Sequence, residues 1–307
     1  MKQSLRIVFM GTPEFAVPML DSLCHSAHSV VGVVTAPDRP AGRGMQLSES
    51  DIKKYAKSKG LLILQPEKLK NENFLAQLKA LNADIFVVVA FRMLPEIVWA
   101  MPPLGTINLH ASLLPQYRGA APIHWAIING EKQTGVTTFK LQHEIDTGQI
   151  ILQSKVPIRD DETVGELYHE LMDIGKHTLL NTVDAIAQGD YPLAAQDHIQ
   201  DVKHAPKLFK ENCQIDWTTD ATTIYNKVRG LSPSPTAWTT LQGKILKIYR
   251  CEKCITPHLQ AAGAIDTDGK TYLRYYCADG FIELIEVQLE GKRKIEVSEF
   301  LKGYKVQ

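Results

Sequence analysis

The first half of the chain alternates short, nearly uninterrupted apolar runs with segments of helical composition. Five apolar runs have the length of strands: Ile7–Met10, Ser29–Thr35, Leu61–Leu64, Ile85–Ala90 and Thr106–Leu109. A strand that is apolar along its whole length is buried on both faces, as in a parallel sheet that helices cover on each side. Helical segments such as Asp51–Ser58 and Asn73–Leu81 lie between the runs. This alternation predicts an α/β fold with a doubly wound, mostly parallel sheet.

A long amphipathic segment follows, over Thr163–Gly189. Thr163 and Glu166 have the spacing of a capping box, and apolar residues recur at helical intervals up to Gly189, a typical C-terminal stop. The polar stretch after this helix, residues 190–206, contains little that indicates a strand. It is therefore predicted to be a linker.

The sequence beyond the linker changes in character. Short strand-like runs separated by Gly and Asp turns cover Lys244–Arg250, Thr271–Cys277 and Phe281–Val287, a pattern typical of a small β-barrel. From Ala205 onward the chain carries 15 Lys and Arg against 12 Asp and Glu, a mild excess that permits contact with nucleic acid without requiring it. We therefore expect three parts: a catalytic domain over 1–189, a linker over 190–206 and a C-terminal β-barrel domain over 207–307.

The charge and composition of the whole chain exclude several classes of protein. The 307 residues include 34 Lys and Arg and 34 Asp and Glu, so a uniformly basic nucleic-acid binder is excluded. The longest apolar run, Ile85–Phe91, is far shorter than the roughly 20 residues of a membrane helix. We find no signal-peptide pattern before the first strand, and five cysteines do not suggest a disulfide framework. We expect a reduced, cytoplasmic protein.

The segment Gly105–Gly119 combines polar side chains with the end of a predicted strand. Asn108 and His110 are two residues apart, so on a strand they point to the same side of the sheet. They lie at the carboxyl end of the strand, which is where open α/β sheets bind ligands. An amide beside an imidazole suits the stabilisation of an oxyanion during a proton transfer. An Asn-x-His triplet alone is also, and more often, a turn residue beside an ordinary hydrogen-bonded histidine.

A second candidate is Asp146, which begins the sequence Asp146-Thr-Gly148. An aspartate facing His110 would orient the imidazole and stabilise its charged form. Asp-Thr-Gly is also a common turn, in which the carboxylate bonds its own backbone. The spacing of the two segments leaves both interpretations open.

Three other motifs carry weaker signals. The first strand is followed by one of the three glycines of a dinucleotide fingerprint, with Asp38 as a possible ribose-binding acid. Cys251 and Cys254 have zinc-like spacing without a second matching pair, so core or turn cysteines are favoured. The loop that contains Arg39 and Arg43 is rich in Pro and Gly, and it suits either a solvated connection or a grip on phosphates.

Taken together, these segments resemble the methionyl-tRNA formyltransferase family, and the resemblance extends over essentially the whole chain. The catalytic residues shared by formyltransferases that use 10-formyltetrahydrofolate are matched by Asn108, His110 and Asp146. The family's Ser-Leu-Leu-Pro signature, which lies against the folate, is matched by Ser112, Leu113, Leu114 and Pro115. The resemblance implies a Rossmann-like formyltransferase fold and formyl transfer to an amine, with the folate as co-substrate and with neither a metal nor a nicotinamide.

Three further features imply that the acceptor is methionine on charged initiator tRNA. They are the opening Phe9–Ala16, the loop Pro37–Gly44, and the C-terminal motifs Ile215–Trp217 and Val228–Ala237. The resemblance assigns two loop residues to tRNA binding, namely Arg39 and Arg43. It assigns Met93 and Leu94 to the folate site, although Phe91–Pro95 departs here from the Tyr-Gly-containing segment of many relatives. Met45 and Gln46 stand where relatives often carry basic residues.

Two alternatives remain open from the sequence. The resemblance extends in part to the amino-sugar formyltransferases, which have a similar second domain but lack the arginine-bearing loop. A catalytically silent protein that binds tRNA or folate would keep the fold without turnover. The intact set of Asn108, His110 and Asp146 favours an enzyme, and we expect a monomer that makes no contact with membranes.

Overall fold

The structure is a computed structural model that describes residues 4–41, 46–196 and 201–306. The chain divides into two compact units. The first comprises Met1–Arg118, Gly135–Val156 and His169–Lys203, and the second comprises Gly119–Thr134, Pro157–Tyr168 and His204–Gln307. Each unit is built around its own core, so the two are described separately.

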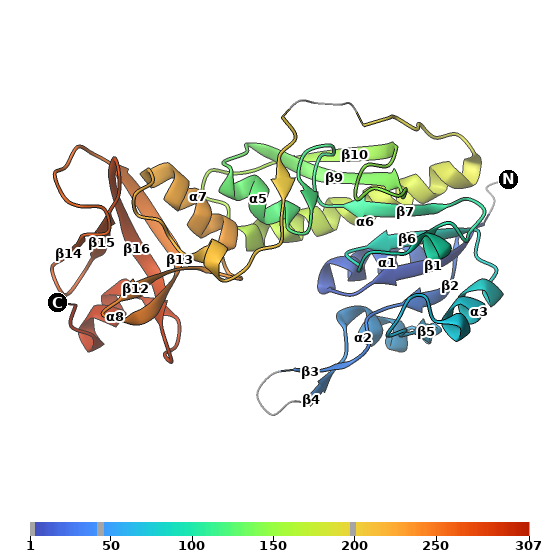
Figure 1. Ribbon diagram of the computed structural model, residues 1–307, viewed down its shortest axis with the longest axis horizontal. Helices are drawn as coiled ribbons and strands as arrows, with labels where there is room; N and C mark the ends of the chain where they lie inside the picture. The colour runs from blue at the N-terminus through green and yellow to red at the C-terminus, as the bar shows by residue number, and fades with distance from the viewer. Residues whose placement is uncertain (1–3, 42–45, 197–200, 307) are drawn as a thin grey trace. The chain divides into compact units, whose positions relative to one another are not determined.

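The first unit contains a seven-stranded sheet in the order β10-β9-β7-β6-β1-β2-β5 (Figure 1). Its strands are β1 (Arg6–Gly11), β2 (Ser29–Val34), β5 (Ile63–Leu64), β6 (Ile85–Val89), β7 (Thr106–His110), β9 (Gln133–Lys140) and β10 (Ile150–Pro157). The first five of these pair in parallel, and β9 pairs antiparallel with β7. The five apolar runs of the sequence thus form the parallel part of the sheet, which confirms the predicted doubly wound fold. The apolar pattern does not predict β9 and β10, which extend the sheet beyond β7.

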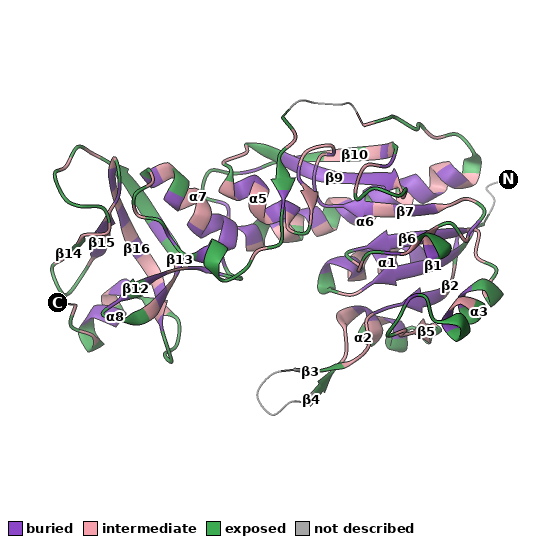
Figure 2. Cartoon of the chain, in the orientation of Figure 1, coloured by how far each residue is buried: buried purple, intermediate pink, exposed green. Residues whose placement is uncertain are grey.

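Helices accompany the strands of this sheet. Four of the strands, β1, β6, β7 and β9, are buried along most of their length (Figure 2). The helices are η1 (Glu14–Ala16), α1 (Val17–Cys24), α2 (Asp51–Ser58), α3 (Glu72–Ala80), α4 (Glu96–Trp99) and α6 (Val164–Gln188). The predicted capping box is present at the start of α6, where the Thr163 N–H donates to Glu166 Oε2 at 2.8 Å. Gly189, at φ +73°, ends the helix in a conformation that favours glycine.

Two very short pairs of strands lie outside the main sheets. β3 (Arg39–Ala41) and β4 (Gln46–Ser48) pair antiparallel as a hairpin where the sequence predicted a loop. The hairpin's tip, residues 42–45, lies outside the described residues, and Arg43 with it. β8 (Arg118–Gly119) and β11 (His204–Ala205) each have two residues.

The second unit contains a six-stranded antiparallel sheet in the order β12-β13-β16-β15-β14, with β17 paired to β16. Its strands are β12 (Ala237–Leu241), β13 (Lys244–Ile255), β14 (Ile265–Thr267), β15 (Leu273–Tyr276), β16 (Gly280–Leu289) and β17 (Ile295–Glu296). This sheet confirms the predicted small C-terminal β domain. The sheet is curled but not closed, so the domain is a half-barrel. Helical segments absent from the sequence prediction complete the unit: α5 (Pro122–Ile128), η2 (Glu211–Cys213), α7 (Ala221–Leu231) and α8 (Val297–Gly303).

The cysteines with zinc-like spacing lie on β13 and differ in their surroundings. Cys251 is buried in the core of the second unit, and this burial raises the pKa of its thiol to about 12. Cys254 is exposed. Within the described ranges, no group of three or more His, Cys, Asp or Glu side chains could hold a metal ion. Among the same residues, no helix combines the length and the apolar character needed to cross a membrane.

Removal of the cap of α7 is expected to destabilise the second unit. Asp220 precedes the helix, and its carboxylate accepts from the Thr223 N–H at 2.9 Å and from Thr223 Oγ1 at 2.6 Å, contacts that lower the pKa of Asp220. We expect Asp220→Ala to lower the free energy of unfolding by about 1 kcal/mol at pH 7. A depressed carboxyl pKa stabilises the fold above its unfolded-state value, so this loss should shrink as pH falls.

Denaturant titrations of Asp220→Ala and Asp220→Asn at pH 7 and pH 3 measure both effects. Asparagine caps helices as well as aspartate does but does not titrate, so Asp220→Asn is expected to stay near the parent at pH 7. An equal loss in the two variants would mean that the cap is not the stabilising contact.

Candidate active site

The carboxyl ends of β6 and β7 meet at one edge of the first unit's sheet. The two strands are adjacent and parallel, with Val88 opposite Asn108 and Val89 opposite Leu109. Chain connections run from β1 outward through β2 to β5 on one side and through β6 to β7 on the other, so their direction reverses between β1 and β6. Open α/β sheets bind ligands beside such a reversal, outside the carboxyl ends of the strands.

Asn108 and His110 occupy alternate positions of β7 and therefore share one face of the strand. His110 Nε2 lies 2.8 Å from the carbonyl oxygen of Tyr117, and His110 Nδ1 lies 3.8 Å from Oδ2 of Asp146. The side chains of His110 and Asp146 are only 8% and 12% exposed. The structure thus brings together two residues that lie on different segments, which the sequence spacing could not establish.

These contacts define what the cluster can do chemically. A carbonyl oxygen only accepts hydrogen bonds, so His110 Nε2 carries the proton that it donates to Tyr117, while the Asp146 carboxylate lies beside the other ring nitrogen. The Asn108 side chain is half-buried and hydrogen-bonds to none of the residues that the structure describes. Its amide is therefore available to donate to an added oxygen. An amide donor beside an imidazole suits the stabilisation of an oxyanion.

The loop after β7 is fixed by side chains from β9 and β10. Ser112 is fully buried and donates from Oγ to the carbonyl oxygen of Gln116 at 2.6 Å. Thr137 of β9 accepts from the Leu114 N–H at 3.1 Å and donates to the Ser112 carbonyl oxygen at 2.7 Å. Gln153 of β10 donates to the Leu114 carbonyl oxygen at 2.9 Å. The loop that carries the Ser-Leu-Leu-Pro sequence is therefore held in one conformation.

The other residues assigned to the folate differ in exposure. Leu113 and Pro115 are half-buried, and Met93, in the loop after β6, is 72% exposed. Leu94 is buried in the core beneath that loop, at 8% exposure. Met93 therefore offers apolar surface beside the end of β7, whereas the Leu94 side chain is occupied by core packing.

The two loop arginines lie on or beside the β3–β4 hairpin. Arg39 begins β3 and is exposed, and its side chain makes no hydrogen bond or ion pair with the described part of the chain. Burial lowers the pKa of Arg92, and the charge of Arg39 lowers it further. Asp38, the candidate ribose acid, instead forms an ion pair with Lys53 at 2.5 Å.

Sequence reasoning missed the residues that hold the site in place. They contact it through side-chain or backbone hydrogen bonds and come from four separate segments: Tyr117, Thr137, Gln153 and Gln196. Each of these four residues has a hydrogen-bond partner that is distant in sequence, and no local sequence motif marks any of the four. Only the pairing of β7 with β9 places Thr137 opposite His110.

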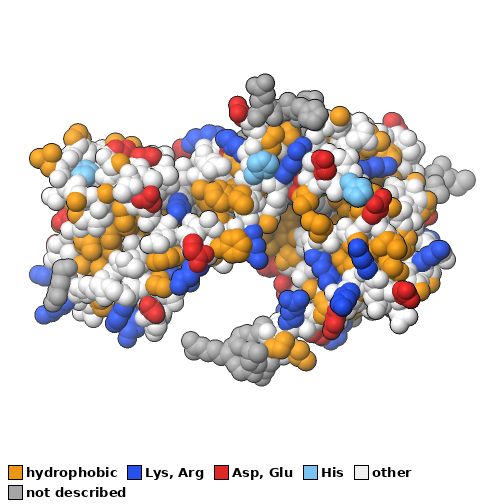
Figure 3. Space-filling model, viewed as in Figure 1, with side chains coloured by type: hydrophobic (Ala, Val, Ile, Leu, Met, Phe, Trp, Pro, Cys, Tyr) orange, Lys and Arg blue, Asp and Glu red, His pale blue; other side chains and the backbone are white. Residues whose placement is uncertain are grey.

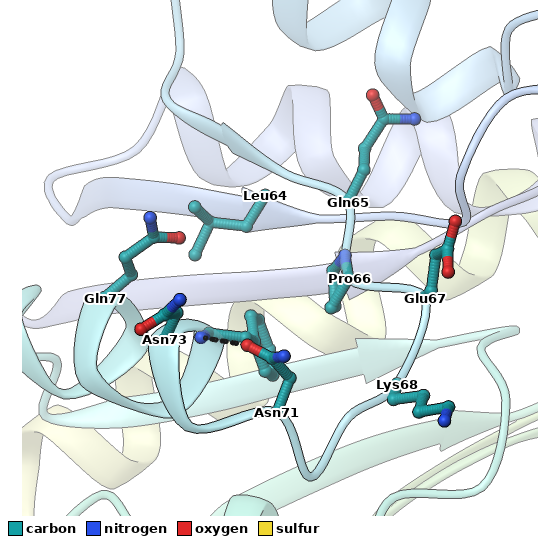
Figure 4. A pocket seen from close by; sticks show the side chains of 9 residues that line it. Leu64, Gln65, Pro66, Glu67, Lys68, Asn71, Asn73 and Gln77 are labelled. Atoms are coloured by element: carbon teal, nitrogen blue, oxygen red, sulfur yellow. Dashed lines mark hydrogen bonds between the residues drawn. The ribbon is translucent and has the colours of Figure 1, made fainter.

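A separate hollow lies at the carboxyl end of β5 (Figure 4). Its lining comes from the end of β5, the loop after it and α3: Leu64, Gln65, Pro66, Glu67, Lys68, Asn71, Asn73, Phe74 and Gln77. β5 is four positions from β7 in the sheet, or about 19 Å at the usual spacing of about 4.8 Å between strands. The hollow is therefore not part of the Asn108, His110 and Asp146 cluster.

Comparison with known families agrees with this fold and site. Residues 5–183 match the family described as Formyl transferase, and residues 207–305 match the Formyl transferase, C-terminal domain. HypX from Aquifex aeolicus, solved in complex with tetrahydrofolic acid, has the same fold with a TM-score of 0.66 and 19% identity. That alignment covers 99% of this chain and 48% of HypX. The two family matches therefore define a formyl-transferring enzyme.

Two curated relatives narrow the class. A methionyl-tRNA formyltransferase of Parabacteroides distasonis is 52% identical over 314 residues, which cover 99% of this chain and 97% of the relative. A methionyl-tRNA formyltransferase of Bacteroides thetaiotaomicron is 49% identical over 313 residues, with the same shares covered. The chain belongs to the methionyl-tRNA formyltransferase family.

Proposed function

We propose that this enzyme transfers the formyl group of 10-formyltetrahydrofolate to the α-amino group of methionine on charged initiator tRNA. The observation that carries the proposal is identity of about half of all residues with methionyl-tRNA formyltransferases over both units. The product, N-formylmethionyl-tRNA, serves translation initiation. This identity does not favour amino-sugar formylation, the alternative that the sequence left open.

The residues around the end of β7 suit the folate as co-substrate. Asn108 offers an amide without a partner among the described residues, and Met93 offers exposed apolar surface in the adjoining loop. The fixed backbone of Ser112 to Pro115 supplies a rigid wall. The folate supplies the formyl carbon, so the reaction exchanges its bond to the folate nitrogen for an amide bond to the methionine amine.

Each of the three polar residues then has a separate role. Asn108 donates a hydrogen bond to the formyl oxygen as that oxygen gains negative charge, and His110 contributes positive charge on the same face of β7. Asp146, 3.8 Å from His110 Nδ1, balances the imidazolium. Its carboxylate also takes the proton that the amine loses, through an ordered water, and the departing folate nitrogen then takes up that proton as its bond to the formyl carbon breaks. The chain's contribution is alignment and electrostatics rather than covalent chemistry.

We assign the recognition of tRNA to two arginines of the loop Pro37–Gly44. On the face that Figure 3 shows, Lys and Arg side chains are interspersed with Asp and Glu rather than forming one basic surface. Arg39 is exposed at the base of the hairpin, so it adds positive charge without a described acidic partner. Arg43, beyond the described residues, belongs to the same loop. Both arginines are proposed to bind tRNA phosphates.

Arg43→Ala is expected to raise the KM for methionyl-tRNA while leaving folate binding unchanged. Removing an arginine that binds a phosphate also lowers the salt dependence of tRNA binding, so the slope of log K against log salt should fall by about 1. Filter binding of tRNA at several salt concentrations, with folate binding by fluorescence as the control, measures both quantities. An equal loss of folate affinity would contradict this division of labour.

Three further assignments accompany the proposal. Residues 1–189 form the catalytic domain, 190–206 the linker and 207–307 the tRNA-contacting domain, boundaries that the family matches at 5–183 and 207–305 support. The enzyme acts in the cytoplasm, where charged tRNA is available. It acts as a monomer, which sedimentation at micromolar concentration tests.

Formyl transfer from 10-formyltetrahydrofolate to methionyl initiator tRNA tests the function directly. Methionyl elongator tRNA and a sugar amine serve as alternative acceptors in the same assay. Formylation confined to the initiator tRNA is expected. Turnover on the sugar amine with indifference to tRNA would replace the proposed acceptor, and folate binding without any transfer would discard the proposed reaction.

A further inference from the structure

A glutamine in the stretch that the sequence marks as linker is bonded to the turn that carries Asp146. Gln196 Nε2 donates to the carbonyl oxygens of Asp146 and Gly148, at 2.8 and 2.9 Å. Arg118 donates to Gln196 Oε1 from Nε at 3.1 Å and from Nη2 at 2.5 Å. Because arginine only donates, the amide oxygen must face Arg118 and the amide nitrogen must face the two carbonyls. The orientation of the amide is therefore fixed from both sides.

The turn that receives these bonds needs to be held. Asp146 has φ +55°, a left-handed conformation that a non-glycine residue adopts at a cost in energy. Gly148 packs so closely on β9 that an added Cβ would lie 1.6 Å from the Lys140 carbonyl oxygen. A small relaxation of this turn would move the Asp146 carboxylate away from His110 Nδ1, which is 3.8 Å away.

The same stretch of chain also supports the other side of the His110–Asp146 pair. The Lys203 carbonyl oxygen accepts from the Tyr117 N–H at 2.7 Å, and the Lys203 N–H donates to Gln116 Oε1 at 2.8 Å. The carbonyl oxygen of Tyr117 is the partner of His110 Nε2. Residues on both sides of the pair are thus tied to the stretch between Gln196 and Lys203, of which residues 197–200 are outside the description.

We propose that Gln196 is a positioning residue for catalysis, which holds the Asp146–Gly148 turn so that the Asp146 carboxylate faces His110, with Arg118 fixing the orientation of its amide. The inference rests on the proposed role of Asp146 in formyl transfer. Gln196 acts through backbone atoms of the turn and through no contact with either substrate.

Two substitutions separate the proposed contacts. Gln196→Leu has a similar volume and removes both donors and the acceptor. Gln196→Glu keeps an oxygen for Arg118 but replaces the N–H donors with an oxygen that repels the carbonyls of Asp146 and Gly148. Because a misplacement of about 1 Å in a catalytic group can cost about 100-fold, both variants are expected to lose about 10- to 100-fold in kcat. The KM for methionyl-tRNA should change by less than about 3-fold.

Two comparisons distinguish positioning from a merely structural role. Gln188→Leu is the matched control, because Gln188 is exposed at the end of α6 and makes no hydrogen bond to the turn within the described residues. An equal loss in Gln188→Leu would overturn the proposal. Gln196→Leu is also combined with Asp146→Asn. If Gln196 acts through Asp146, the second change adds little to the first, whereas multiplied losses would contradict the proposal.

Hydrogen–deuterium exchange tests, independently of turnover, whether Gln196 holds the Asp146–Gly148 turn. Peptides that cover residues 141–149 are expected to exchange faster in Gln196→Leu than in the parent, with peptides from the β13–β16 sheet unchanged. An inactive parent would remove the proposed function while exchange still reported on the anchor. An active parent with unchanged kcat and unchanged exchange in Gln196→Leu would overturn the positioning role alone.

Discussion

Replacing Asn108 with alanine is expected to lower the rate of formyl transfer by about 100- to 1,000-fold, the usual cost of removing one donor to an oxyanion. The loss should fall on kcat, because the amide bond to the formyl oxygen strengthens only as negative charge develops there. Folding should change little, since the side chain hydrogen-bonds to none of the described residues. Single-turnover formylation of methionyl initiator tRNA measures the rate, and thermal unfolding measures the fold.

The matched control for this prediction is Asn181→Ala. Asn181 is exposed on α6 and lies outside the proposed site, so the same substitution there should leave the rate near that of the parent. Near-parental turnover in Asn108→Ala, or a loss that tracks a lower melting temperature, would remove Asn108 from the oxyanion role.

The parallel sheet could be predicted because its strands are buried on both faces and therefore apolar along their whole length. β6 is buried at all five of its positions, and the corresponding run in the sequence is unbroken. β9 mixes Thr with apolar residues, and two of those threonines, Thr137 and Thr138, hydrogen-bond within the fold, so no clear strand pattern appears. α7 was missed for a different reason: its β-branched residues lower its helical propensity, although Asp220 marks its start.

The candidate site divides in the same way. Asn108 and His110 could be paired from the sequence because a strand repeats every two residues. Their meeting with Asp146 depends on the loop that connects β9 to β10. Gln196, which hydrogen-bonds to that loop, lies 50 residues further along the chain. Contacts of this kind are set by how separate elements pack, so no spacing in the sequence predicts them. The family resemblance identified Asn108, His110 and Asp146, but it identified none of the residues that hold these three in place.

The largest expected loss follows from His110→Ala, at about 1,000- to 10,000-fold in kcat. This substitution removes the positive charge beside the formyl oxygen and also the ring against which the Asp146 carboxylate is placed for its proton transfer, so two contributions are lost together. It also removes the donor to the Tyr117 carbonyl oxygen and opens space at a side chain that is 8% exposed. A lower melting temperature is therefore expected as well, and the alanine variant alone cannot separate charge from packing.

His110→Gln makes that separation. The glutamine amide can reach the position of ring Nε2 and donate to the Tyr117 carbonyl oxygen, but it carries no charge and transfers no proton. We expect this variant to melt close to the parent while its kcat stays within about 10-fold of the alanine variant, because the electrostatic contribution dominates the rate. Recovery of turnover together with stability would mean that His110 serves only to support the loop. The oxyanion would then depend on Asn108, and the 3.8 Å approach of Asp146 to the ring would have no part in the reaction.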